Sequence, residues 1–200
     1  SMFTGESDDL LRLDETITAR LSVASLGSSP TQASLTELSE RSVKDRRMPS
    51  KPIRASSPPP EKIQNIGLAG ELFAAHWIEA NFGLPREETW RSGYRNDILG
   101  GVLGDDSLGY DFSVPMGDVT YLIEVKASTG DDTIFSLPDV EIECALDHAP
   151  HEEYTILFVA NVLTDELRTF AWLPNPLGGH ARFFRREGRQ MKFRFNPTDD

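Results

Sequence analysis

The chain has 200 residues, a formal net charge of −12, and 38% hydrophobic residues, of which the aromatic ones make up 9% of the chain. That length suits one domain of ordinary size, or a domain with a long tail, and the apolar content is enough for a core. No apolar run reaches the ~18 residues that a membrane helix requires, so we expect no membrane partner. The negative charge disfavours non-specific attraction to nucleic acid or to anionic lipid.

Cysteine usage and leader signals indicate the compartment. The chain has one cysteine, Cys144, which excludes an internal disulfide and suits a reducing environment. No secretory signal peptide is visible. We therefore expect a cytoplasmic protein in which Cys144 is a small core residue of a helix.

The first 60 residues differ in composition from the rest of the chain. Two weakly helical segments, at residues 10–21 and 35–43, precede the stretch "MPSKPIRASSPPPEK", which is too poor in apolar residues to form a core. We interpret residues 1–60 as an N-terminal helical and disordered tail with a linker. Whether it docks on the domain, on a second copy of the chain or on another partner stays open.

The pattern sharpens after the linker. The segment "EKIQNIGLAGELFAAHWIEANFG" predicts a helix that begins after the prolines and ends at Gly83. Gly67 and Gly70 each weaken such a helix by about 1 kcal/mol, so they indicate close approach of another backbone. Glu71 lies beside them.

The later elements are predicted in chain order. We expect a strand at residues 88–92, a Gly- and Asp-rich loop at 93–106, a hairpin at 109–128, a helix at 138–148 capped by Ser136, and paired strands at 153–163 and 166–173. This order predicts an α/β sandwich with a mixed sheet over residues 61–177. Residues 178–200 are expected to form a basic C-terminal hairpin packed on that domain.

The hairpin "GYDFSVPMGDVTYLIEVKAS" carries charged residues on otherwise apolar strands. If residues 115–118 form its turn, paired residue numbers sum to 233 and Asp111 lies opposite Leu122. Side chains alternate faces along a strand, so Asp111, Glu124 and Lys126 share one face. Asp111 and Glu124 are then diagonal neighbours with Cα atoms roughly 7–8 Å apart.

An aspartate and a glutamate that converge on one face make an oxygen-ligand site for Mg²⁺ or Mn²⁺. Lys126 reaches the same space, where an ammonium holds an attacking water or balances charge on a phosphate. The carbonyl of Val125 is a candidate third ligand, and Glu71 of the preceding helix completes the set. This combination predicts a centre that hydrolyses phosphodiesters.

The residues "GYD … IEVK" resemble the core motif of the PD-(D/E)XK nuclease superfamily, although Tyr110 replaces the proline of the name. The resemblance implies a restriction-endonuclease-like α/β sandwich with a central mixed β-sheet flanked by helices. It also implies that Asp111 and Glu124 bind the metal ion and that Lys126 assists the nucleophile.

More narrowly, "GLAGE", "GYDF", "IEVKAS" and "FSLPDVEIECA" in this order are similar to the NO VEIN C-terminal-like, Mrr-related domain. That domain is commonly attached to ATPases, helicases and restriction or phage-defence proteins. The resemblance covers about residues 65–163 and implies an endonuclease that acts on DNA in preference to RNA, in restriction or antiviral defence. Glu71 matches the helix glutamate of the pattern, and Glu141 is an accessory candidate at the start of the second helix.

Three further interpretations accompany this hypothesis. The alternative function is a catalytically inactive, nuclease-like module that binds nucleic acid or recruits a partner in a larger ATPase or helicase system. A homodimer or a larger defence-system partner also stays open. Five basic residues of the C-terminus either grip a phosphate backbone or offset the acidic body of the protein: Arg185, Arg186, Arg189, Lys192 and Arg194.

Several other polar and aromatic residues are given ordinary roles. Pro150 separates His148 from His151, which places them in a loop and argues against a zinc site. Trp77, Trp90 and Trp172 are interpreted as core residues.

Overall fold

The computed structural model describes residues 60–130, 132–162, 170–186 and 191–195. The predicted tail at residues 1–60 therefore lies, apart from Pro60, outside the described residues, and so does Arg189.

The centre of the fold is a four-stranded sheet in the order β1-β2-β4-β5. Its strands are β1 (Phe112–Met116), β2 (Val119–Ala127), β4 (Glu152–Val159) and β5 (Phe170–Pro174). β2 runs parallel to β4, whereas β1 with β2 and β4 with β5 are antiparallel. The predicted α/β class with a mixed sheet is confirmed, and the two predicted C-terminal strands pair as expected.

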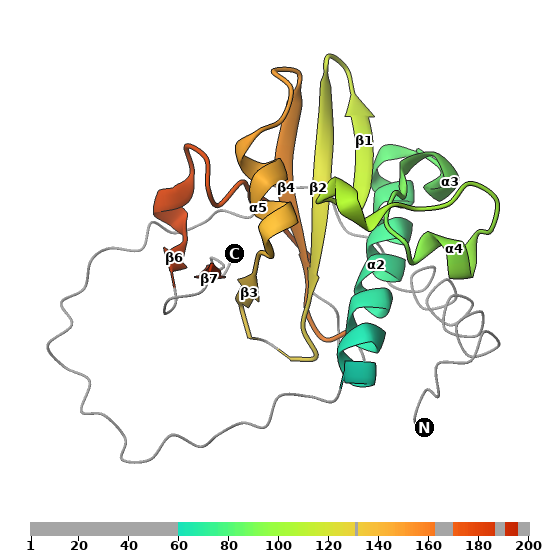
Figure 1. Cartoon of the computed structure of the whole chain (residues 1–200), viewed down its shortest axis with the longest axis horizontal. Coiled ribbons are helices and arrows are strands. Elements are labelled where there is room, and N and C mark those ends of the chain that lie inside the picture. Colours follow the sequence, from blue (N-terminus) through green and yellow to red (C-terminus); the bar gives the residue numbers. More distant parts are fainter. Residues whose placement is uncertain (1–59, 131, 163–169, 187–190, 196–200) are drawn as a thin grey trace, which may run out of the picture.

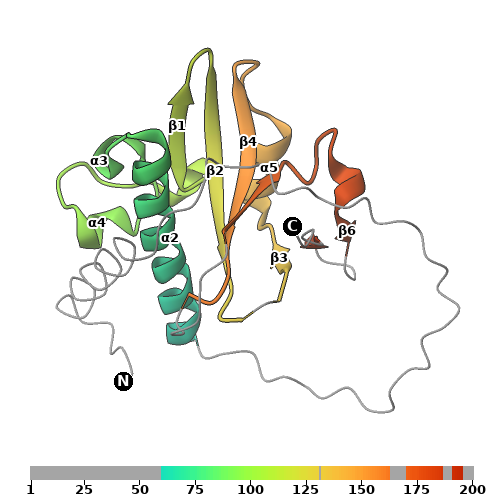
Figure 2. The same ribbon diagram turned by 180° about the vertical axis from the view of Figure 1, so that it is seen from behind.

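Helices and a smaller sheet complete three layers. Figure 1 shows α2 (Pro60–Phe82) on one face of the large sheet, and α5 (Asp139–Leu146) with the small sheet on the other, as does the reverse view in Figure 2. The small sheet has the order β3-β7-β6, with β3 (Ile134–Ser136), β6 (Arg185–Arg186) and β7 (Lys192–Arg194). The short helices are α3 (Arg86–Thr89), α4 (Arg95–Ile98) and the 3-10 turns η2 (Asp106–Leu108) and η3 (Ala181–Phe183).

Helix α2 forms where its apolar spacing predicts it. It ends at Gly83, whose φ of +67° is a left-handed conformation that favours glycine, and the Gly83 N–H closes the last turn on the Glu79 carbonyl at 2.9 Å. A Cβ on Gly70 would lie 2.5 Å from the Cβ of Ala127 on β2. Gly70 therefore lets the helix lie directly on the strand, which confirms the close approach predicted there. At Gly67 the nearest atom to a Cβ would be the Tyr94 hydroxyl at 3.3 Å, which belongs to a side chain and not to another backbone.

Two apolar clusters hold the layers together. One, between α2 and the large sheet, includes Leu72, Ile123 and Val125. The other, on the opposite face, includes Leu122 of β2 and Phe193 of β7. Consecutive residues of β2 thus enter different clusters, as the alternation of side chains along a strand requires.

Two predicted elements are wrong. Residues 88–92 are not a strand, because α3 begins after Pro85 and only Trp90 makes a single bridge to Phe112; a proline there prepares a helix start, and Glu87 and Glu88 favour its first turn. The helix cap is Pro138 rather than Ser136, which pairs with Lys192 in the small sheet. β3 ends at Ser136, and the Leu137 N–H still donates to the Met191 carbonyl at 3.0 Å, because the residue before a proline favours extended backbone rather than a helical turn.

The register of the first hairpin is also different from the prediction. Met116 pairs with Val119 and Phe112 with Ile123, so that paired numbers sum to 235 rather than 233. The turn is the two-residue Gly117-Asp118, in which Gly117 has a φ of +62° that suits a tight hairpin. A shift of two residues leaves every side chain on its predicted face, because the period of a strand is two.

Candidate functional site

The candidate site lies beside β2, just beyond the point where its pairing with the first residue of β1 stops. β1 pairs with residues 119–123 of β2, and the strand runs four residues further, to Ala127. There the Asp111 side chain replaces the missing strand, because its Oδ2 accepts a hydrogen bond from the Val125 N–H at 2.8 Å. The Asp111 N–H still donates to the Ile123 carbonyl of β2 at 2.9 Å, whereas its own carbonyl accepts from the Arg91 N–H at 2.7 Å.

This bond also orients the main chain of Val125. In an antiparallel pair, the N–H and the carbonyl of one residue point to the same side of the strand. Because the Val125 N–H points to the edge that β1 has left, its carbonyl points there as well. The orientation supports the prediction that this carbonyl is available as a ligand.

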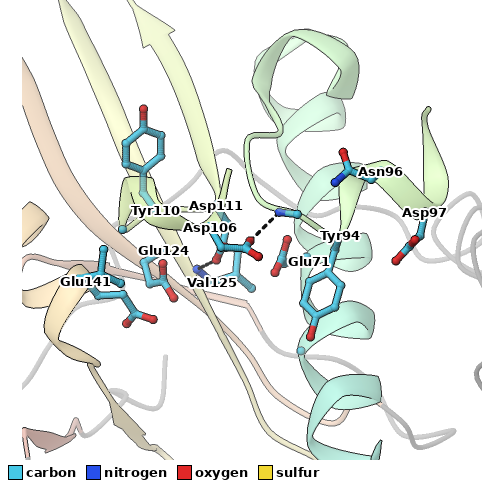
Figure 3. Close-up of a pocket in the computed structure, with 14 residues that line it drawn as sticks. Glu71, Tyr94, Asn96, Asp97, Asp106, Tyr110, Asp111, Glu124, Val125 and Glu141 are labelled. Carbon is cyan, nitrogen blue, oxygen red and sulfur yellow. Dashed lines mark hydrogen bonds between the residues drawn. The ribbon is translucent and has the colours of Figure 1, made fainter. Parts of the chain in front are cut away.

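A cavity of about 500 Å³ opens at this edge of the sheet. Six carboxylates line it (Figure 3), and four of them are candidate site residues: Glu71 from α2, Asp111 before β1, Glu124 from β2 and Glu141 from α5. We call it the carboxylate cavity. The rest of its lining consists of Gly67, Gly93, Tyr94, Asn96, Asp97, Asp106, Gly109, Tyr110, Val125 and Val140.

Glycine at position 109 brings α5 to this cavity. Its φ of +76° is a left-handed conformation, and a Cβ there would lie 2.5 Å from the carbonyl oxygen of Val140. Only a residue without a side chain allows so close a contact. Helix α5 therefore packs against the start of the hairpin, which places Glu141 opposite β2.

Lys126 is held between two carboxylates. Its Nζ donates to Glu124 Oε1 at 2.7 Å and to Glu141 Oε2 at 2.6 Å. The Lys126 side chain is 15% exposed, so these ion pairs are largely sheltered from water. The predicted group of Asp111, Glu124 and Lys126 thus includes Glu141 as a direct partner of the lysine.

Glu71 is held by two donors that the sequence interpretation did not identify as functional. Its Oε2 accepts a hydrogen bond from Trp90 Nε1 at 2.8 Å and another from the Ser92 hydroxyl. The indole N–H also contacts Ser92 Oγ at 2.9 Å. The sequence pattern that indicates these donors is the Trp-x-Ser spacing, which places two polar groups on one side of an extended segment. Trp90 was interpreted as a core residue only.

Burial and mutual repulsion raise the pKa values of three cavity carboxyls. Burial raises the pKa of Glu71 to about 8, against the hydrogen bonds from Ser92 and Trp90, and the charge of Glu124 adds to the rise. Burial and the charge of Glu71 hold the pKa of Asp111 well above its usual range. Burial and the charge of Asp111 do the same to the pKa of Glu124, although Lys126 opposes the effect.

The lysine responds in the opposite sense. Burial lowers the pKa of Lys126, but the charges and hydrogen bonds of Glu124 and Glu141 outweigh that effect and raise it above its ordinary value. Lys126 is therefore a fixed positive charge at neutral pH. Lys126 does not line the cavity itself, whereas six carboxyl groups do. The mutual repulsion that helps to raise the pKa values of Glu71, Asp111 and Glu124 is one that a divalent cation would offset.

The available oxygen ligands suit an ion such as Mg²⁺, which keeps several waters, better than a metal held by protein side chains alone. Within the described ranges, no three His, Cys, Asp or Glu side chains converge closely enough to hold a metal together. Mg²⁺ usually keeps several waters and takes one or two carboxylates from the protein. Asp111 and Glu124, with the Val125 carbonyl, supply that smaller oxygen set.

The basic residues of the C-terminus lie apart from the carboxylate cavity. Arg185, Arg186 and Lys192 are on the small sheet; all three are exposed and none lines the cavity. Arg194 is half-buried, with Nη1 3.8 Å from Asp132 Oδ1. Phe193 is buried beneath them, as its alternation with Lys192 and Arg194 predicts.

Part of the chain matches a known protein family. Residues 101–172 match the model of a family described as Protein NO VEIN, C-terminal, which confirms the predicted resemblance over that range. The range includes Asp111, Glu124, Lys126 and Glu141, while Glu71 lies outside it. No curated protein and no solved structure matches the chain, so the relation to the PD-(D/E)XK superfamily stays a prediction.

Among the described residues, no helix is both long and apolar enough to cross a bilayer.

Proposed function

We propose that this chain is a metal-dependent endonuclease that hydrolyses phosphodiester bonds of DNA, with Mg²⁺ or Mn²⁺ as its cofactor. The observation that carries the proposal is that Asp111 and Glu124 line one cavity at the edge of β2, while the Lys126 ammonium bonds to Glu124 Oε1 at 2.7 Å. Two carboxylates with an ammonium beside them are the groups that phosphodiester hydrolysis requires.

Each residue has a distinct role in this proposal. Asp111, Glu124 and the Val125 carbonyl would hold the ion, which supplies Lewis-acid polarisation of the phosphate when bound. Lys126 orients the attacking water and balances the charge that develops on the phosphate oxygens. Glu71 completes the oxygen set from α2, and Glu141 holds the lysine ammonium in place.

The reaction consumes one water for each bond broken. The water oxygen bonds to phosphorus while one P–O ester bond breaks, and the leaving oxygen takes a proton. The products are one phosphomonoester end and one hydroxyl end. The preference for DNA over RNA, and a role in restriction or antiviral defence, rest on the family resemblance.

The alternative is a nuclease-like module without catalysis, which binds nucleic acid or recruits a partner of an ATPase or helicase system. One observation favours it: both carboxylates next to Lys126 already engage its ammonium, at 2.7 and 2.6 Å. The positive charge of the lysine is thus already offset by two carboxylates, and only one of its three N–H donors is left for a phosphate or a water.

A cleavage assay separates the two functions. The full chain is incubated with plasmid, linear duplex, single-stranded DNA and RNA, with Mg²⁺ or Mn²⁺, and with a chelator. We expect metal-dependent cleavage that the chelator stops, loss of cleavage in Lys126→Ala, and full cleavage in Glu79→Ala, whose side chain is exposed and outside the cavity. Intact nucleic acid under all metal conditions would instead support the binding module.

A further inference from the structure

We propose that Trp90 and Ser92 are positioning residues that hold the Glu71 carboxylate toward the carboxylate cavity. This inference rests on the proposed function, since it concerns how one carboxylate of that centre is oriented. It adds two residues that neither the motif nor the family match identifies, because the matched range begins at residue 101.

The two carboxylate oxygens of Glu71 have different hydrogen-bond partners. Oε2 accepts from both the Trp90 indole and the Ser92 hydroxyl, while no described residue donates a hydrogen bond to Oε1. Two donors on one oxygen fix the rotation of the carboxylate as well as its place. Because Glu71 lines the cavity (Figure 3), the second oxygen is left for a ligand there.

Trp90 is itself immobilised by packing. Its side chain is fully buried, and its ring stacks on Phe112 with centroids 5.6 Å apart and planes 21° apart. Its backbone makes the bridge to Phe112, and its N–H donates to the Arg86 carbonyl at 2.9 Å. A donor held in this way can orient its acceptor, because it does not move to follow it.

The same short segment also holds Asp111. The carbonyl of Asp111 accepts from the N–H groups of Arg91 at 2.7 Å and Ser92 at 3.3 Å. Residues 90–92 therefore bind the main chain of one cavity carboxylate and the side chain of another. This link sets the distance in space between Asp111 and Glu71, which are 40 residues apart in the chain.

The first measurement follows the indole N–H signals by NMR in the full chain without nucleic acid. Trp90→Phe identifies the Trp90 signal among the three tryptophans, and Glu71→Ala is expected to shift that signal alone. Addition of Mg²⁺ should then move the Trp90 signal and leave those of Trp77 and Trp172 in place. If the Trp90 indole N–H signal shifts neither in Glu71→Ala nor on addition of Mg²⁺, the proposal is overturned.

The second measurement is Mn²⁺ binding by calorimetry, together with the Mg²⁺ dependence of cleavage. Loss of a group that orients a ligand typically costs 10- to 100-fold in metal affinity or activity, so Trp90→Phe and Ser92→Ala should each weaken binding by about that factor. Ser92→Thr keeps the hydroxyl and should restore binding. Trp77→Phe is the matched control, because Trp77 stacks on Phe170 and Trp172 outside the cavity.

The outcomes distinguish this inference from the proposed function. If the wild-type chain binds metal and cleaves, but Ser92→Ala and Trp90→Phe do so equally well, the positioning role is wrong and the nuclease stands. If the wild-type chain neither binds metal nor cleaves, the nuclease itself is wrong and the inference fails with it. Ser92→Ala removes a single oxygen, so it remains informative should Trp90→Phe fail to fold.

Discussion

The two halves of β2 have different partners and different chemistry. Residues 119–123 pair with β1 on one side, residues 120–123 also pair with β4 on the other, and none of them carries a charge. Residues 124–127 keep β4 but have lost β1, and here the strand carries Glu124 and Lys126. A strand with one open edge offers its main chain and side chains to a cavity, so the end of β1 is what permits a site.

The comparison also explains how a charged half-strand is stabilised. The apolar half is stabilised by burial against α2, where Ile123 is fully buried. The charged half is stabilised by Lys126, which lies between Glu124 and Glu141, and by Asp111 on the Val125 N–H. Mutual repulsion of the cavity carboxylates, which contributes to the raised pKa values of Asp111 and Glu124, opposes folding there.

The largest expected effect comes from Glu124→Ala. Loss of a ligand that stabilises charge in the transition state should lower the rate of cleavage by at least about 10²-fold without unfolding the domain. On the apolar half, Ile123→Val should cost about 0.5–1.5 kcal/mol of stability with cleavage unchanged. Rates and urea unfolding of both variants check this contrast, and full activity in Glu124→Ala would remove the distinction between the halves.

Gly70→Val tests how closely α2 must lie on β2. A Cβ at position 70 would meet the Cβ of Ala127 at 2.5 Å, so the helix must shift, at a cost of about 1–3 kcal/mol in the free energy of unfolding. Gly179→Val is the matched control, since a Cβ there meets nothing within 4 Å. Equal urea midpoints for the two variants would contradict this packing.

The pH dependence of stability should distinguish the charged region from the apolar one. Burial raises the pKa of Glu71 to about 8, against an ordinary value of 4.5. Between these pH values the folded metal-free protein keeps a proton that the unfolded chain has lost, so the free energy of unfolding falls as pH rises. Urea unfolding between pH 5 and 9 should show this fall, and Glu71→Gln should lessen it; an unchanged slope would refute the burial of an ionisable Glu71.

The smallest expected effect concerns the small sheet. If Arg186 and Lys192, both exposed, contact a phosphate backbone, the double variant Arg186→Ala, Lys192→Ala should reduce the salt dependence of DNA binding by about two units of slope. Cleavage of bound DNA should be unaffected, because neither residue lines the cavity. Arg186→Lys keeps the charge and serves as control. An unchanged salt slope in the double variant would mean that these residues do not contact the phosphate backbone and only offset the negative charge of the rest of the protein.

Much of the architecture could be predicted from local patterns. Helix α2, its end at Gly83 and the close approach at Gly70 follow from apolar spacing and glycine placement. The strands β4 and β5 follow from two apolar runs. The shared face of Glu124 and Lys126 does not depend on the register of the hairpin, because both lie on β2. Asp111 lies before β1, and its side chain bonds the Val125 N–H at the edge of the sheet.

Contacts between distant segments lay beyond such patterns. The Trp-x-Ser segment was predicted as part of a strand, yet it lies after a short helix and binds Glu71, which precedes it by about 20 residues. Glu141 could be recognised as a carboxylate at a helix start, but its bond to Lys126 depends on how α5 packs at Gly109. Periodicity reports which face a side chain is on, whereas the partner it meets there depends on how the elements pack across the chain.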